Sequence, residues 1–167
     1  ASTLKVQNIA HTGGTAAIAV DSSGRITNPN VPYIFADLHN GSSAGYDSHS
    51  NQTPVEFRNV ISSRGGFSLN TGTHTFTVPV TGIYQINFSL LISGSGSNID
   101  FSIGPSQGNE VYRTYSYDAR STHAAIAIPF TAGDTFQLRN SSGSSVSIHR
   151  NTDATDRYTH LSAYLIG

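Results

Sequence analysis

Apolar residues in this chain recur mainly at every second position, and this spacing constrains the fold more than any other feature of the sequence. In segment 83–92, for example, Tyr84, Ile86, Phe88 and Leu90 share one side of an extended strand. The spacing of an amphipathic helix is hard to find, and clusters of Gly, Asn, Asp and Ser separate the alternating segments. The sequence therefore predicts an all-β protein. The expected strands are residues 4–9, 16–20, 33–38, 55–61, 66–69, 73–78, 82–92, 98–103, 110–117, 122–130, 134–140, 145–149 and 159–166.

The chain length and two prolines predict one main domain preceded by a short leader. The 167 residues are within the range of a single domain. The first thirty residues read as two tight hairpins, which alone bury too little surface to be stable. They need a neighbour, either the following domain or other copies of the chain. Pro29 and Pro32 each fix their own φ angle and restrict the preceding residue, so we expect a β-hairpin leader or collar at 1–30 and a sandwich at 31–167.

Composition excludes several classes of partner. Only 11% of the residues are charged, against about a quarter in ordinary domains, and the net charge is -1. A nucleic-acid partner is not expected, because the chain has no excess of basic residues. Membrane insertion is not expected either, because no apolar run approaches the roughly 18 residues of a spanning helix. The sequence begins at Ala1 and holds no methionine, so we expect a fragment or a processed product.

No motif predicts an enzyme. The chain has no cysteine nucleophile, no Gly-x-Ser-x-Gly motif, no phosphate-binding glycine loop with lysine, and only two glutamates. Asp153 and Asp156 lie three positions apart in a loop rich in Thr and Asn, which is more typical of a solvated turn than of a glycan-cleaving pair. The seven histidines do not show the spacing of metal ligands. We therefore expect neither catalysis nor a cofactor.

Two of the later strands, near 122–130 and 159–166, are apolar or small on both faces. The outer face of an antiparallel sandwich normally meets water and is polar. A second buried surface would explain the pattern. It could be a contact with other copies of the chain, or a loop of the same chain that covers the strand.

Four segments carry a resemblance to a known family: PVEFRNV at 54–60, TFTVPVTGIYQINF at 75–88, GDTFQL at 133–138 and THLSAYL at 159–165. They resemble the globular head of the complement C1q family and its tumour necrosis factor relatives. The resemblance covers residues 31–167 and implies a ten-stranded jelly roll that assembles as a homotrimer about a three-fold axis. The chain departs from the family in the long loop at 39–53 and in Ala163, where a glycine is usual.

The resemblance, combined with strand alternation, assigns residues to the trimer interface. Small side chains among them would allow close approach of the three copies. In the last strand, the assignment puts Tyr164 and Ile166 on the opposite face. The expected interface residues are Gln85, Asn87, His123, Ala125, Ala127, Leu161, Ala163 and Leu165.

The leader carries a second resemblance. Segment 11–27, followed by Pro29 and Pro32, is similar to segments that precede the terminal head in bacteriophage tail-fibre proteins. This similarity implies a head at the distal end of a virion tail fibre, outside the cell.

The loops most distant from the leader are the candidate receptor-binding region. Consecutive antiparallel strands alternate in direction, so the loops at 39–53, 93–97, 118–121 and 141–157 are expected at that end, provided that the last strand ends beside the leader as the family resemblance implies. Calcium held by carboxylates there is an alternative that no motif supports. The candidate residues are Tyr46, Asp47, Tyr117, Asp118, Arg120, Arg150, Asp153, Asp156 and Arg157.

The predicted function is therefore a trimeric, non-catalytic head of a phage tail fibre that recognises a glycan or protein on the host cell surface. Two alternatives remain in the same fold: a structural trimerisation cap of the fibre, and a C1q-like lectin of cellular origin. A glycan-cleaving depolymerase is a third alternative.

Overall fold

The structure is a computed structural model, and it describes residues 7–10, 13–14, 16–38, 45–93, 98–105, 108–117, 120–150 and 157–167. All regular secondary structure in these residues is β-strand, as the alternation predicted. They include no helix long and apolar enough to cross a membrane.

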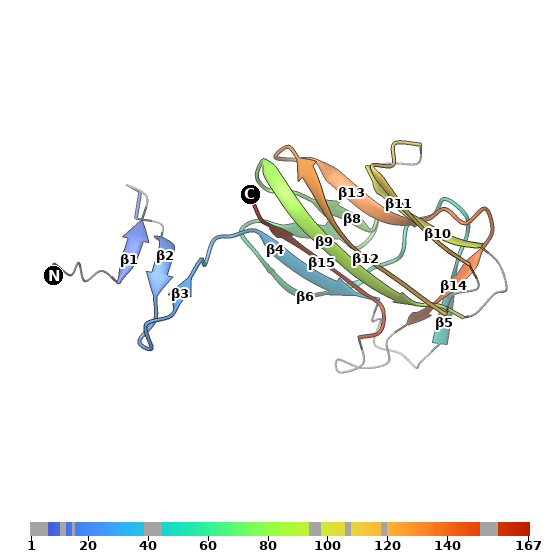
Figure 1. The fold of residues 1–167 in the computed structure, drawn as a ribbon, viewed down its shortest axis with the longest axis horizontal. Coiled ribbons are helices and arrows are strands. Elements are labelled where there is room, and N and C mark those ends of the chain that lie inside the picture. The colour runs from blue at the N-terminus through green and yellow to red at the C-terminus, as the bar shows by residue number, and fades with distance from the viewer. Residues whose placement is uncertain are drawn as a thin grey trace.

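The leader forms a small antiparallel sheet of its own, in the order β1-β2-β3. Its strands are β1 (Asn8–Ala10), β2 (Ala16–Val20) and β3 (Ile26–Thr27). In the turn between β2 and β3, Asp21 Oδ1 accepts hydrogen bonds from the backbone N–H groups of Ser23 and Arg25 at 2.9 and 3.0 Å. Figure 1 shows this sheet beside the head, joined to it by an extended segment, and within the described residues no leader strand pairs with a head strand.

One face of the leader sheet is apolar. Ile9 lies opposite Ile18, and Val20 lies opposite Ile26, so the alternation of strands puts all four side chains on the same face. Ile9 and Ile26 are 55% and 71% exposed. Three short strands bury too little surface to be stable alone. This face therefore needs cover that the described part of the chain does not supply.

The head consists of two five-stranded antiparallel sheets packed face to face (Figure 1). This arrangement confirms the expected jelly-roll sandwich. The first sheet contains, in spatial order, β12 (Ser121–Phe130), β9 (Gly82–Leu91), β15 (His160–Leu165), β4 (Tyr33–Asp37) and β6 (Asn59–Arg64). The second contains β11 (Tyr112–Tyr117), β10 (Asn98–Gly104), β13 (Thr135–Asn140), β8 (Thr75–Thr77) and β7 (Ser68–Asn70).

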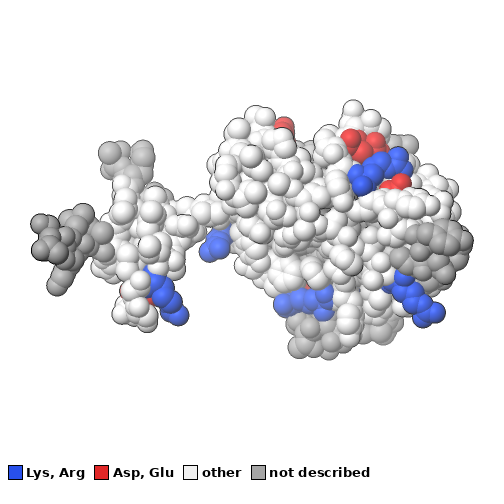
Figure 2. All heavy atoms as spheres, viewed as in Figure 1, with Lys and Arg blue, Asp and Glu red and all other residues white. Residues whose placement is uncertain are grey.

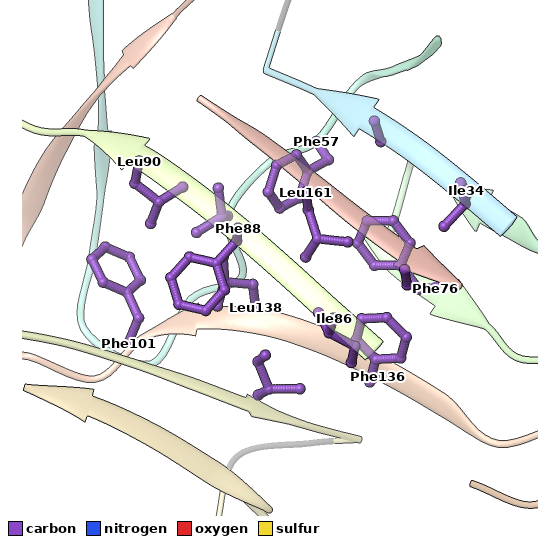
Figure 3. Packing of buried hydrophobic residues seen from close by; sticks show 14 of the residues in the cluster. Ile34, Phe57, Phe76, Ile86, Phe88, Leu90, Phe101, Phe136, Leu138 and Leu161 are labelled. Carbon is purple, nitrogen blue, oxygen red and sulfur yellow. The ribbon is translucent and has the colours of Figure 1, made fainter. Parts of the chain in front are cut away.

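Aromatic side chains fill much of the space between the two sheets (Figure 3). Phe136 of the second sheet stacks on Phe76 of the same sheet, with ring centroids 5.0 Å apart, and on Phe130 of the first sheet at 5.4 Å. Tyr84 is fully buried, and its hydroxyl donates a hydrogen bond of 2.9 Å to the Val80 carbonyl oxygen. Each such ring removes about 150–250 Å² from water. The rings therefore hold the sheets together.

Two strands of the first sheet present the faces that their alternation predicted. In β9, Tyr84, Ile86, Phe88 and Leu90 are buried. In β12, Ile128 is buried and Ala124 and Ile126 pack against the core, whereas the alternate residues are exposed. The exposed residues of β12 include His123, Ala125 and Ala127.

The last strand has the opposite orientation to the expected one. Leu161 and Ala163 of β15 are fully buried, and lie opposite Phe88 and Ile86 of β9, so they belong to the core of a single chain. Leu165 also packs against this core. The expectation that Leu161 and Ala163 line a trimer interface is therefore wrong, whereas the assignment of the partly exposed Leu165 stays a prediction. The alternate residues of β15, which face outward, are His160, Ser162 and Tyr164.

Two segments near the far end also differ from the expected strands. Residues 45–49, expected in a loop, form β5 (Gly45–His49), which pairs with β14 (Val146–Arg150) in a separate two-stranded sheet. Residues 55–58, expected to begin a strand, have no regular structure, although Val55 and Phe57 are buried. Figure 1 shows β5 and β14 at the end of the head opposite the leader.

His49, the last residue of β5, is only 2% exposed. Its Nδ1 atom lies 3.3 Å from the Pro54 carbonyl oxygen, and its Nε2 atom is buried without a hydrogen-bond partner among the described residues. Burial lowers the pKa of His49 below its usual 6.5, and Arg58 acts in the same direction. Glu56, the contact with Pro54, and Asp47 act in the opposite direction without overcoming burial. The folded head therefore favours the neutral imidazole.

We expect His49→Gln to make the thermal stability of the head less dependent on pH. The folded-state pKa lies below the unfolded value near 6.5, so the contribution of His49 is complete above that pH, declines below it and is lost as the pH falls through the folded-state pKa. Glutamine cannot titrate there. Melting temperatures would be measured by circular dichroism at about pH 7.5 and about pH 5, and the fall in Tm between them should be larger for wild type than for the variant. Each kcal/mol of unfolding free energy moves the Tm of such a domain by about 2–4 °C. Equal drops in both proteins would contradict this role of His49.

Candidate recognition site at the far end of the head

The predicted receptor-binding residues divide into those that the structure describes and those that it does not. Asp118, Asp153 and Asp156 lie outside the described residues. Tyr117 is the last residue of β11, and its side chain is also outside the described part. The remaining candidates are Tyr46, Asp47, Arg120, Arg150 and Arg157.

The β5–β14 sheet has two chemically different faces. Tyr46 lies opposite His149, and Ser48 lies opposite Ser147, so these four side chains share the outer face. The inner face, which packs toward the head, carries the alternate residues of both strands. These are Asp47, His49, Val146, Ile148 and Arg150.

Asp47 holds the inner face of this sheet to the segment before β6. Its Oδ1 accepts a hydrogen bond from Arg150 Nη1, and its Oδ2 accepts one from Arg58 Nη1, both at 2.9 Å. Arg58 also pairs with Glu56. Two guanidinium groups therefore face two carboxylates. The side chains of Asp47 and Arg150 are only 18% and 22% exposed, so these two candidates form ion pairs within the chain and offer little surface to a ligand.

Arg157 and Arg120 have different surroundings. Arg157 Nε lies 3.8 Å from Asp37 Oδ2, and its guanidinium carbon lies 5.7 Å from the centre of the Phe35 ring. Asp37 is fully buried and also accepts a hydrogen bond of 3.1 Å from Asn59 Nδ2, so Arg157 compensates a buried carboxylate. Arg120 is exposed, and its carbonyl oxygen accepts a hydrogen bond from the Ile92 N–H group at 2.7 Å. Arg120 is thus the more accessible of these two cations.

An aromatic cluster lies on the outer face of the β5–β14 sheet. The rings of Tyr46 and His149 meet edge to face with centroids 5.2 Å apart, and those of His149 and Tyr158 do so at 5.5 Å. Tyr46 is 50% exposed and Tyr158 is 51% exposed. Sequence reasoning missed His149 and Tyr158. Only the pairing of β5 with β14, about one hundred positions away in the chain, brings His149 to Tyr46, and the segment before β15 then brings Tyr158 to His149.

The outer face of the first sheet is polar and uncharged at its centre, and Arg64 lies toward its edge, opposite Tyr33. Gln85 Nε2 donates a hydrogen bond of 3.3 Å to Asn87 Oδ1, and Asn87 Nδ2 donates one of 3.4 Å to Ser162 Oγ. The exposed Ala125 and Ala127 lie beside this ladder on β12. Figure 2 shows charged side chains in only a few separate places on the visible surface, with wide uncharged areas between them.

Two other kinds of site receive little support from the described residues. Within them, no three His, Asp or Glu side chains are grouped as a metal site requires. A cavity of about 340 Å³ lies around the turn between β12 and β13, and no predicted receptor-binding residue lines it. Its lining residues are Pro105, Val111, Pro129, Phe130, Gly133, Asp134 and Thr135.

No protein-family model matches the sequence, and a search of curated proteins found no match. Many solved structures are similar to this chain, including the following three. A TNF protein, Eiger, from S. frugiperda is 16% identical, with a TM-score of 0.64, over 83% of this chain and 94% of that chain. The globular domain of the zebrafish complement 1qA protein is 14% identical, with a TM-score of 0.57, over 81% of this chain and 98% of that chain. Murine APRIL is 15% identical, with a TM-score of 0.56, over 81% of this chain and 99% of that chain.

At such identities the comparisons bear on the fold alone. They agree with the two-sheet topology and with the fold that the motifs of the sequence predicted. The two five-stranded sheets of the head therefore have a jelly-roll fold like that of TNF and C1q globular domains.

Proposed function

We propose that this chain is a non-catalytic recognition head, which assembles as a homotrimer and binds a surface ligand at the end remote from its leader. The observation that carries the proposal is the exposed aromatic cluster of Tyr46, His149 and Tyr158 at that end. Exposed tyrosines are frequent at binding surfaces, because they combine a large apolar ring with a polar tip. The leader leaves the head at the opposite end, so it does not obstruct a large ligand (Figure 1).

Self-association is supported by two uncovered surfaces. The part of the outer face of the first sheet formed by β12, β9 and the middle of β15 has small side chains at Ala125 and Ala127 and an internally bonded polar ladder, so another copy could approach that part closely without desolvating a charge. The apolar face of the leader, with Ile9 and Ile26, also needs cover. Copies of the chain arranged about one axis would cover both surfaces together.

The setting we propose is the distal end of a phage tail fibre, where the head would bind a host cell-surface glycan or protein without a cofactor. Similarity of the leader segment 11–27 to tail-fibre segments supports this setting. The fold is equally consistent with a C1q-like lectin of cellular origin. A purely structural trimerisation cap is the alternative that binding experiments would separate from both.

We expect Ala127→Arg to break the trimer and leave each protomer folded. Ala127 is exposed in the single chain, so the new side chain costs the protomer little, whereas in the trimer it would bury three unpaired charges at several kcal/mol each. Sedimentation should give about three times the 17.7 kDa chain mass for wild type and the single-chain mass for the variant.

Ser68→Arg is the matched control, because Ser68 is an exposed strand residue of the second sheet. This control should remain trimeric. A monomeric wild type, or an unperturbed trimer in Ala127→Arg, would contradict the proposed interface.

Blocking the far end should abolish binding to surfaces. The chain contains no cysteine, so one introduced cysteine can carry a bulky polyethylene glycol through a maleimide. We expect the polymer on Ser48→Cys in β5 to prevent binding to those bacterial or animal cells that wild type binds. The polymer on Ala132→Cys, in the turn between β12 and β13 at the leader end, should leave binding intact.

Labelled wild-type head would first be screened against a panel of bacterial strains and animal cell lines by flow cytometry. Absence of binding to every surface would favour the structural cap. Equal binding by the two polymer-coupled variants would place the recognition site away from the far end.

A further inference from the structure

We infer that the outer face of the β5–β14 sheet binds a neutral sugar ring of a glycan. The inference rests on the proposed recognition role and adds the chemical class of the ligand. Three observations support the inference. Aromatic rings lie on this face, hydroxyl groups lie beside them, and the charged side chains of β5 and β14 all lie on the inner face.

The aromatic rings form a platform of the kind that apolar sugar faces stack on. Tyr46 and Tyr158 each meet the His149 ring edge to face, with interplanar angles of 84° and 85°. His149 therefore holds both tyrosines, while about half of each tyrosine remains open to solvent. A pyranose presents several C–H groups on one face, and an exposed tyrosine ring can cover them without losing a hydrogen bond.

Hydroxyl groups lie next to this platform on the same face. Ser48 and Ser147 are directly opposite one another, two positions along the strands from the Tyr46–His149 pair. Two strand positions span on the order of 7 Å, which is comparable to the width of one sugar ring. Each serine hydroxyl can both donate and accept a hydrogen bond, as sugar hydroxyls do. A ring stacked on Tyr46 would therefore have polar partners within reach.

The charge distribution selects neutral sugars over acidic ones. Asp47 and Arg150, the charged residues of the two strands, point to the inner face and pair with each other there. Among the described residues of β5 and β14, none places a charge on the outer face. A sialic or sulfated sugar bound there would lose water from its anionic group and gain no cation from the two strands in return.

The platform is rigidly supported from below, which reduces the entropy cost of binding. Asp47 connects β5 to β14 and to Arg58. Asn140 Nδ2 donates hydrogen bonds of 2.8 Å to the carbonyl oxygens of His49 and Ser144, so β13 supports the same sheet. The four outer side chains thus sit on a sheet whose position is set by the head.

The test is binding of the 167-residue chain to an array that carries neutral glycans, including lactose, maltotriose, mannobiose and N-acetylglucosamine oligomers, beside sialylated and sulfated glycans. We expect wild type to bind at least one neutral glycan and to show no preference for acidic ones. Tyr46→Thr removes the ring but keeps a β-branched strand residue, and should weaken the Kd for that neutral glycan about tenfold. Tyr46→Phe keeps the ring and should retain most of the affinity.

Tyr115→Thr is the matched control, since Tyr115 is a 66% exposed tyrosine on β11 of the second sheet. It should bind like wild type, and melting curves should show all three variants folded. The inference is overturned if no neutral glycan binds, if acidic glycans are preferred, or if Tyr46→Thr binds as well as wild type.

These outcomes are separate from those of the proposed recognition role. Suppose that the polymer on Ser48→Cys blocks cell binding but that wild type binds no neutral glycan on the array. This result would overturn the sugar inference and leave the recognition role standing. Neutral-glycan binding that depends on Tyr46, without cell binding by any head, would support the sugar site and overturn the recognition role.

Discussion

The stacking of Phe136 on Phe76 and Phe130 is the contact on which the rest of the head depends. The stacked rings join β12 of the first sheet to β8 and β13 of the second, and they lie between the two five-stranded sheets. A strand can point only alternate side chains into this interior. Its other face is therefore free for a different task, and in the first sheet the centre of that face is rich in small or amide side chains.

The same alternation organises the far end on a smaller scale. The β5–β14 sheet directs its charged residues inward, where Asp47 connects two arginines, and its aromatic rings outward. The ion pairs are partly sheltered from water and compensated by Glu56, so they position the sheet with little net charge. Structural support and exposed aromatic surface thus come from adjacent residues of the same two strands.

Some of these features could be read from the sequence, and others could not. The inward faces of β9 and β12 were predicted, in β9 because its two residue sets differ in polarity, and in β12 because the isoleucines lie on one face and the smaller alanines on the other. In β15, leucine and alanine alternate with tyrosine and serine, so either face could serve as the interior. The register that puts Leu161 opposite Phe88 resolves the choice, and it also removes Leu161 from any surface between copies. Asp47 and Arg150 were predicted at the far end, but their mutual ion pair was not.

By itself, the sequence determined the all-β class, the strand alternation and the turn positions, because these depend on neighbours within a few residues. It also determined the jelly-roll fold, because its family motifs are recognisable. Only the tertiary structure decided which face of β15 is buried and that segment 45–49 is a strand. It also decided that Tyr46, His149 and Tyr158 form one cluster. The physical reason is that β5 and β14 are about one hundred residues apart in the chain. Pairing at that separation is set by packing of the whole head, which no local pattern encodes.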